Sequence, residues 1–259
     1  MIKIYYEIKF YSPWHCGSGL GGGNDADYCP IKDIDGFPFI PGKTIKGLFR
    51  EASEVLNDKK FTERIFGIAS TKNDEFDQSG EAIWSNAELS TEERNEIKGN
   101  SLVEKIYLNQ YFTKINSNGI TEDKSLRRGE YAIPMLLKAT IMVPSKDDVE
   151  PIKNCMGYIK HIGLQRSRGF GRCDIKLNDV QEIAKSNVAI NERKKEYFFK
   201  CKFLTPIVLN TTGATEGVLS DTLDYIPGAN FLGIIAKNYS EFGEEAFDIF
   251  HSGRPAWRQ

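Results

Sequence analysis

The N-terminal ten residues alternate between apolar and polar side chains, with apolar residues at Ile4, Tyr6, Ile8 and Phe10. A period of two puts one set of side chains on each face of a β-strand, which predicts a strand with one buried face. The same alternation returns over residues 135–143 and 173–177, and Ile83 with Trp84 indicates a shorter strand within 81–87. We therefore expect four strands within the first 180 residues.

Helical periodicity separates these strands. Over residues 43–57, apolar side chains recur at three- and four-residue intervals, which predicts an amphipathic helix. A capping box of Ser145 and Asp148 predicts a second helix that runs to His161, with Gly163 as its C-cap.

The remaining stretches before residue 180 are less regular. Ser90 and Glu93 form another capping box, for a brief helix through Lys98. Residues 100–130 are polar and give no clear prediction. The main elements follow the order β-α-β-β-α-β, which is the ferredoxin-like (RRM-like) arrangement of the α+β class.

Part of the sequence pattern of the first domain is repeated, less completely, near the end of the chain. Ile226-Pro227-Gly228 repeats the turn Ile40-Pro41-Gly42, after an aromatic strand expected over 197–204. A partial unit cannot bury its own sheet face. It packs on the first unit, or on another chain, or the sequence is a fragment of a longer, multi-unit protein, which is the interpretation we favour. The expected division is a complete domain over 1–180, a linker over 181–195 and a partial second unit over 196–259.

Composition narrows the class of protein. The 259 residues are 40% hydrophobic, enough for a substantial core. No apolar run approaches the roughly 20 residues of a membrane-spanning helix, so we expect a cytoplasmic protein with no membrane partner. Five scattered cysteines without a CxxC pair favour reduced thiols. The net charge of -2 gives no overall basic field, so a nucleic-acid partner must be attracted by local patches.

A glycine-rich loop follows the first strand and leads to Asp27. A loop carboxylate serves as a general base or holds a divalent ion. Asp25 and Asp27 are both carboxylates of this loop, and the family resemblance given below singles out Asp27 for the catalytic or metal-binding role. The alternative is a solvated turn former. His15, at the start of the loop, is a candidate RNA contact or proton donor, or else an ordinary polar loop residue. Asp33 and Asp35 are expected to shape a hairpin turn ending at Gly36.

A basic turn lies late in the first domain, with Arg166, Arg168 and Arg172 between glycines. Glycine lets the backbone approach a phosphate closely, and guanidinium groups bind phosphate through two parallel hydrogen bonds. We expect these three arginines to contact RNA; the alternative is a solvated basic turn. Arg127 and Arg128 are weaker candidates.

The first helix carries a second set of cations, Lys43, Lys46 and Arg50, on or beside one face near its N-terminus. The helix dipole also favours phosphate there, so these residues are further RNA-binding candidates. An ordinary solvated helix face is the alternative. All of these predictions require the aspartate loop and the arginine turn to converge on one side of the sheet.

Three motifs span the first domain: Ile40-Pro41-Gly42-x-x-x-x-Gly47-x-x-Arg50, Ile65-Phe66-Gly67, and the glycine loop over 163–172. Together they resemble the RAMP superfamily, the RNA-recognition-like proteins of CRISPR-Cas effector complexes. The glycine-rich loop followed by Asp27-Tyr28-Cys29-Pro30 is most similar to the repeating backbone subunit of type III effectors.

The resemblance implies a subunit that lines up along CRISPR RNA with other effector subunits and cuts the paired target RNA through an aspartate, here Asp27. We expect a divalent metal, Mg²⁺, to assist that cleavage. Two alternatives are a non-catalytic scaffold or capping subunit, and a repeat-RNA processing endoribonuclease that uses His15.

Overall fold

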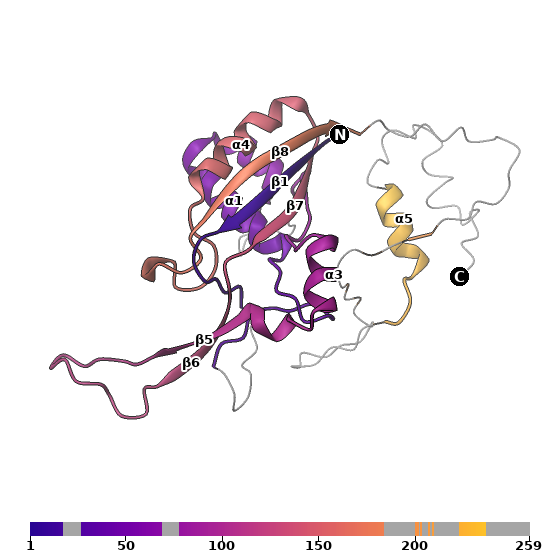
Figure 1. The fold of residues 1–259 in the computed structure, drawn as a ribbon. Helices are drawn as coiled ribbons and strands as arrows, with labels where there is room; N and C mark the ends of the chain where they lie inside the picture. Colours follow the sequence, from indigo (N-terminus) through magenta and orange to yellow (C-terminus); the bar gives the residue numbers. More distant parts are fainter. Residues whose placement is uncertain are drawn as a thin grey trace, which may run out of the picture. The chain divides into compact units, whose positions relative to one another are not determined.

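The structure is a computed structural model that describes residues 1–17, 27–68, 78–183, 200, 201, 203, 207, 209 and 223–236. The chain divides into two compact units, Met1–Val188 and Ala189–Gln259. Almost all of the described residues belong to the first unit (Figure 1). The expected glycine loop over 18–26 lies outside the described residues.

Four strands form the main sheet: β1 (Ile2–Phe10), β4 (Ile83–Trp84), β7 (Leu136–Val143) and β8 (Cys173–Glu182). Their order is β4-β7-β1-β8, and each neighbouring pair is antiparallel. The four strands predicted from the alternation are confirmed. β8 is longer than predicted and continues to Glu182, while β4 is only two residues long.

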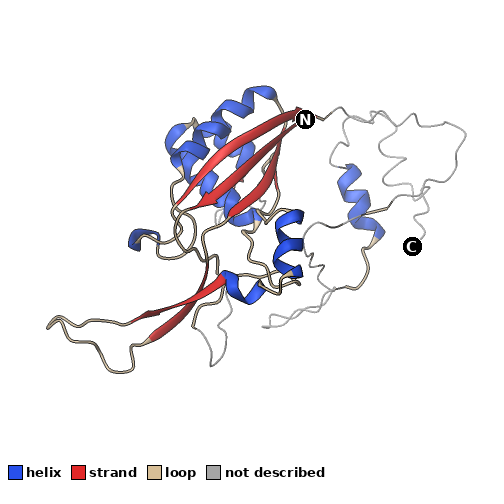
Figure 2. Cartoon of the chain, viewed as in Figure 1, coloured by secondary structure: helices blue, strands red, loops and turns tan. Residues whose placement is uncertain are grey.

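Two helices, α1 (Gly42–Leu56) and α4 (Val149–Tyr158), cover one face of this sheet and contact each other (Figure 2). Phe49 on α1 is fully buried, with its ring centroid 6.0 Å from that of Tyr6 and 5.0 Å from that of Trp84. Burying a side chain of this size contributes about 1.5–3 kcal/mol. The predicted strand and helix patterns therefore meet in one core, which confirms the α+β class.

Both predicted capping boxes are present, one before α3 (Thr91–Gly99) and one before the 3₁₀ turn η2 (Lys146–Asp148) that leads into α4. The predicted end of the second helix is wrong. α4 ends at Tyr158, not at His161, and Gly163 is not its C-cap. Beyond the helix, the carbonyl of Lys160 accepts the N–H of Cys173 at 2.9 Å, so pairing with the start of β8 replaces a further helical turn.

Residues 100–130 contain an element that the hydrophobic pattern did not predict. After the 3₁₀ turn η1 (Val103–Ile106), β5 (Tyr107–Phe112) and β6 (Arg127–Ala132) form an antiparallel hairpin. Figure 1 shows this hairpin projecting away from the main sheet. The first unit also contains α2 (Lys59–Phe66), β2 (Gly67–Ile68) and β3 (Gln78–Ser79).

The second unit contains one described helix, α5 (Gly228–Ala236). Most of the strand predicted over 197–204 lies outside the described residues. Within the described part of the chain, no helix is both long and apolar enough to span a membrane.

Candidate functional site

The site is built on the segments that flank the glycine loop. Trp14 is fully buried, stacks on Phe10 with ring centroids 4.6 Å apart, and exchanges backbone hydrogen bonds with Ala132 at the end of β6. Beyond the loop, the N–H of Ile31 donates to the carbonyl of Cys16 at 2.8 Å. The two ends of the loop are therefore held side by side.

Asp27 is exposed and is fixed by β6. Its N–H donates to the carbonyl of Arg128 at 2.8 Å, and the N–H of Arg128 donates to Asp27 Oδ2, also at 2.8 Å. The N–H of Glu130 then donates to the carbonyl of Tyr28 at 2.9 Å. The carboxylate is thus oriented by a neighbouring strand.

His15 is buried, with 2% of its surface exposed, so little of the side chain is available for the expected RNA contact. Its Nδ1 lies 2.8 Å from the carbonyl oxygen of Glu130. A carbonyl only accepts, so Nδ1 carries the proton. Burial lowers the pKa of His15, against the opposing effect of the Glu130 carbonyl, and the ring packs on Tyr131 at 5.3 Å. The imidazole therefore acts as an internal support.

The arginine turn is anchored to the same segment. Its centre is the 3₁₀ turn η3 (Arg166–Arg168). The N–H of Leu164 donates to the carbonyl of His15 at 2.9 Å, and that of Gly171 donates to Pro13 at 2.8 Å. Gly163 has a φ of +100°, and a Cβ there would lie 2.4 Å from the His15 carbonyl oxygen, so only glycine fits.

The three arginines differ in their surroundings. Arg166 lies 3.7 Å from the carboxylate of Glu51 on α1, an acidic neighbour that the local sequence did not reveal. Arg172 lies over the ring of Tyr11, 5.9 Å from its centroid. Arg168 is exposed, and among the described residues no carboxylate lies within ion-pair distance of it. Arg168 is therefore the most available of the three for an external anion.

One cavity joins these elements. It has a volume of about 510 Å³, within the usual range of ligand sites. Its lining includes His15, Asp27 and Arg166, with Thr44 and Leu48 supplied by α1. The aspartate loop and the arginine turn therefore do converge on one side of the molecule.

The cations of α1 do not line this cavity. At about 100° per residue, Lys43, Lys46 and Arg50 lie at least about 100° around the helix from Thr44. Arg50 is also paired with Glu54 at 3.1 Å. The structure thus brings together Asp27 and the arginine turn but leaves the three helix cations on a different face.

For a divalent ion, the described residues offer Asp27 but no cluster of three or more His, Cys, Asp or Glu side chains that could hold a metal. Burial raises the pKa of the nearby Cys16 thiol to about 12, which disfavours the thiolate that binds metals. Mg²⁺ is commonly held by one or two carboxylates completed by phosphate oxygens and water. One oriented carboxylate beside a basic turn fits that pattern, and the ion stays a prediction.

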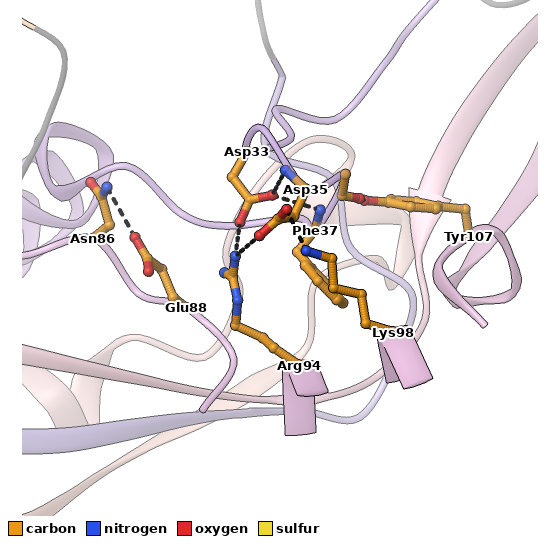
Figure 3. Close-up of polar contacts among 9 residues, drawn as sticks. Asp33, Asp35, Phe37, Asn86, Glu88, Arg94, Lys98 and Tyr107 are labelled. Atoms are coloured by element: carbon orange, nitrogen blue, oxygen red, sulfur yellow. Dashed lines mark hydrogen bonds and ion pairs between the residues drawn. The ribbon is translucent and has the colours of Figure 1, made fainter. Parts of the chain in front are cut away.

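The predicted turn at Asp33 and Asp35 is confirmed. Asp33 Oδ1 accepts the N–H groups of Asp35 and Phe37, both at 2.9 Å. Figure 3 shows both carboxylates facing α3, where Asp33 meets Arg94 at 2.6 Å and Asp35 meets Lys98 at 2.6 Å. The Lys98 hydrogen bond lowers the pKa of Asp35. These carboxylates hold the chain that leaves Asp27 and are not part of the cavity.

The comparisons with known proteins bear on the family and the fold. The family model of the RAMP superfamily matches residues 7–174, a range that contains all three sequence motifs, Asp27 and every basic candidate. The chain belongs to the RAMP superfamily. The resemblance drawn from the motifs is therefore confirmed. No curated protein gives a significant match.

Solved structures show the same fold. In the cryo-EM structure of a type III-B Cmr-beta complex bound to cognate target RNA, one chain matches this RAMP protein with a TM-score of 0.54 and 10% identity, covering 68% of this chain and 96% of that one. A chain of the apo state of Cmr-beta matches with a TM-score of 0.51, 11% identity and the same coverage.

Two features of the site were missed from sequence. The backbone of Arg128 orients Asp27, whereas the sequence suggested only an RNA contact by the charged side chain of Arg128. Tyr131 and Phe170 pack together at 4.7 Å beneath the arginine turn. Burial raises the pKa of Tyr131, with nearby Arg168 acting in the opposite direction. Both contacts join segments far apart in the chain, and no local pattern signals them.

Proposed function

We propose that this chain is a CRISPR RNA-binding backbone subunit of a type III-like effector complex, and that it cuts guide-paired target RNA beside Asp27. The observation that carries the proposal is the convergence of Asp27 and Arg166 on one cavity of a RAMP protein. The type III-B complex that contains a chain of similar fold is bound to target RNA, which supports the same class of partner here.

In the proposed reaction, a ribose 2′-OH of the target attacks the adjacent phosphorus. Asp27 takes the hydroxyl proton, and Arg166 with Arg168 neutralises charge on the phosphorane. The 5′-oxygen leaves and takes a proton from water, so the products carry a 2′,3′-cyclic phosphate and a 5′-hydroxyl. As the alternative role, Asp27 would hold Mg²⁺ together with the RNA phosphates, and the ion would supply charge neutralisation.

The architecture supports the ferredoxin-like part of the proposal, because β1, α1, β4, β7, α4 and β8 follow the β-α-β-β-α-β order. A second RAMP-like unit after residue 195 is supported by the start of α5. The N–H of Asn230 donates to the carbonyl of Pro227 at 2.9 Å, as that of Thr44 does to Pro41 at 2.9 Å. We place the protein in the cytoplasm, with CRISPR RNA, target RNA and other effector subunits as partners.

A non-catalytic scaffold is the second candidate. It is favoured by one observation, that among the described residues no metal-binding cluster accompanies Asp27. A repeat-RNA processing role for His15 is disfavoured, because that ring is buried and its Nδ1 is engaged by Glu130.

The test uses the complex purified with its CRISPR RNA and a labelled complementary RNA. Asp27→Ala should reduce cleavage by at least about 100-fold, the loss typical of a general base, while the complex assembles and binds target normally. Wild-type cleavage by Asp27→Ala would leave only the scaffold role. Absence of any co-purifying RNA would refute both candidates.

A further inference from the structure

The hairpin β5–β6 continues into the aspartate segment. Tyr28 bridges to Gly129 in parallel register, and the Glu130 N–H to Tyr28 carbonyl bond extends that pairing by one step. Asp27 is the first described residue of this added strand. Its two bonds with Arg128 close a ring in which each residue donates one backbone N–H.

The group that holds the carboxylate is the backbone of Arg128, not its side chain. The guanidinium Nε donates instead to Asn109 Oδ1 on β5 at 3.2 Å. In an antiparallel pair the N–H and C=O of one residue point to the same side, so both backbone groups of Arg128 face Asp27 and neither belongs to the β5–β6 ladder. Asp27 Oδ2 is thereby occupied, while no described residue donates a hydrogen bond to Oδ1.

Gly129 makes this close approach feasible. A Cβ at that position would lie 2.9 Å from the Tyr131 ring and 3.4 Å from the Tyr28 ring. The Tyr28 side chain is further held by Arg127, whose guanidinium donates to the Tyr28 hydroxyl at 3.1 Å. Asp27 and Tyr28 are therefore bound to the hairpin through both backbone and side chain.

We propose that β6 is the positioning element for Asp27, with the Arg128 N–H as the positioning group that presents Oδ1 to the RNA. This inference rests on the proposed function of Asp27. A carboxylate displaced by about 1 Å from its reacting proton can lose a factor of about 100 in rate, so the ring of two hydrogen bonds is sufficient to control cleavage. Contacts made by the projecting end of the β5–β6 hairpin are thereby linked to the orientation of the Asp27 carboxylate.

The test compares two substitutions at one residue in the complex assembled with CRISPR RNA. Arg128→Ala removes the side chain and keeps the N–H, so its single-turnover rate is the reference that accounts for any contribution of the guanidinium. Arg128→Pro also removes the N–H and should cut about 10- to 100-fold more slowly than Arg128→Ala. Its affinity for target RNA should equal that of Arg128→Ala, a separation of rate from binding that a general loss of structure would not give.

A second variant covers the case in which Arg128→Pro does not assemble. Asp27→Glu keeps the charge but moves the carboxylate out of the ring, so it should also cut at least about tenfold more slowly with unchanged target affinity. Equal rates for Arg128→Pro and Arg128→Ala, or a wild-type rate for Asp27→Glu, would overturn the inference. Asp27→Asn distinguishes the positioning role of Arg128 from the proposed function. If Asp27→Asn is inactive and Arg128→Pro is fully active, only the positioning role is refuted. If Asp27→Asn is active, the proposed function itself is refuted.

Discussion

Replacing Gly163 by alanine tests the link between the arginine turn and the first strand's loop. The residue has a φ of +100°, where an L side chain is strained by about 1–3 kcal/mol. The new Cβ would also lie 2.4 Å from the His15 carbonyl oxygen, which accepts the N–H of Leu164. Losing that hydrogen bond costs about 1 kcal/mol, so the free energy of unfolding should fall by about 2–4 kcal/mol.

Two glycines provide matched controls. Gly169 also has a positive φ, +85°, but a Cβ there meets nothing within 4 Å, so Gly169→Ala measures the backbone strain alone. Gly157 lies inside α4 with open space around it, and Gly157→Ala should stabilise the protein by about 0.5–1 kcal/mol. Urea unfolding followed by far-ultraviolet circular dichroism gives all three values.

The difference between Gly163→Ala and Gly169→Ala isolates the contact with His15. If the unfolding free energies of the two variants agree within about 0.5 kcal/mol, the reasoning is refuted, because the carbonyl of His15 then moves away from the new Cβ without loss of stability. If Gly163→Ala is the less stable, its RNA affinity should also fall, since Arg166 loses its fixed position in the cavity that Asp27 also lines.

Two further predictions concern charge. If phosphates are bound by the arginine turn, Arg168→Ala should reduce the slope of the logarithm of the RNA-binding constant against log salt concentration by about 0.7–0.9. Arg166→Ala should reduce this slope by less, because Glu51 already lies beside that guanidinium. Fluorescence anisotropy with single-stranded RNA measures both slopes. An equal effect of both would contradict the assignment. Burial lowers the pKa of His15 from 6.5, so below pH 6.5 the unfolded state binds a proton at this residue more readily than the folded state does. The free energy of unfolding should therefore fall as the pH drops below 6.5. His15→Asn keeps an N–H donor for Glu130 and should flatten this dependence in urea titrations at pH 5.5 to 7; an unchanged slope would show that other groups cause it.

Local pattern predicted the main sheet because each of its strands has one face against the core. β1 alternates along its whole length, and Phe49 on α1 meets that face at Tyr6. The capping boxes were predictable for a similar reason, since Ser90 and Glu93 lie three residues apart and need no distant partner. The end of α4 was not, because Lys160 pairs with Cys173 across a turn that has no periodic signal.

The hairpin was missed because its strands have no continuous buried face. β5 has no buried residue, and β6 is buried at Gly129, Tyr131 and Ala132, of which the first has no side chain, so apolar residues do not alternate over a detectable length. The site was only partly predictable for a related reason. Residue type suggested Asp27 and the arginines, but the burial of His15 and the backbone role of Arg128 arise from contacts more than 100 residues apart.

The central place of β1 in the sheet has a consequence for how the protein is made. The strand is synthesised before both of its hydrogen-bonding neighbours, residues 136–143 and 173–182. At about 5–20 residues per second, an alternating apolar stretch waits on the order of ten seconds or more for either neighbour to be synthesised. A nascent chain of this protein should therefore depend on chaperones until β7 emerges, and truncation before that point should yield an aggregating product.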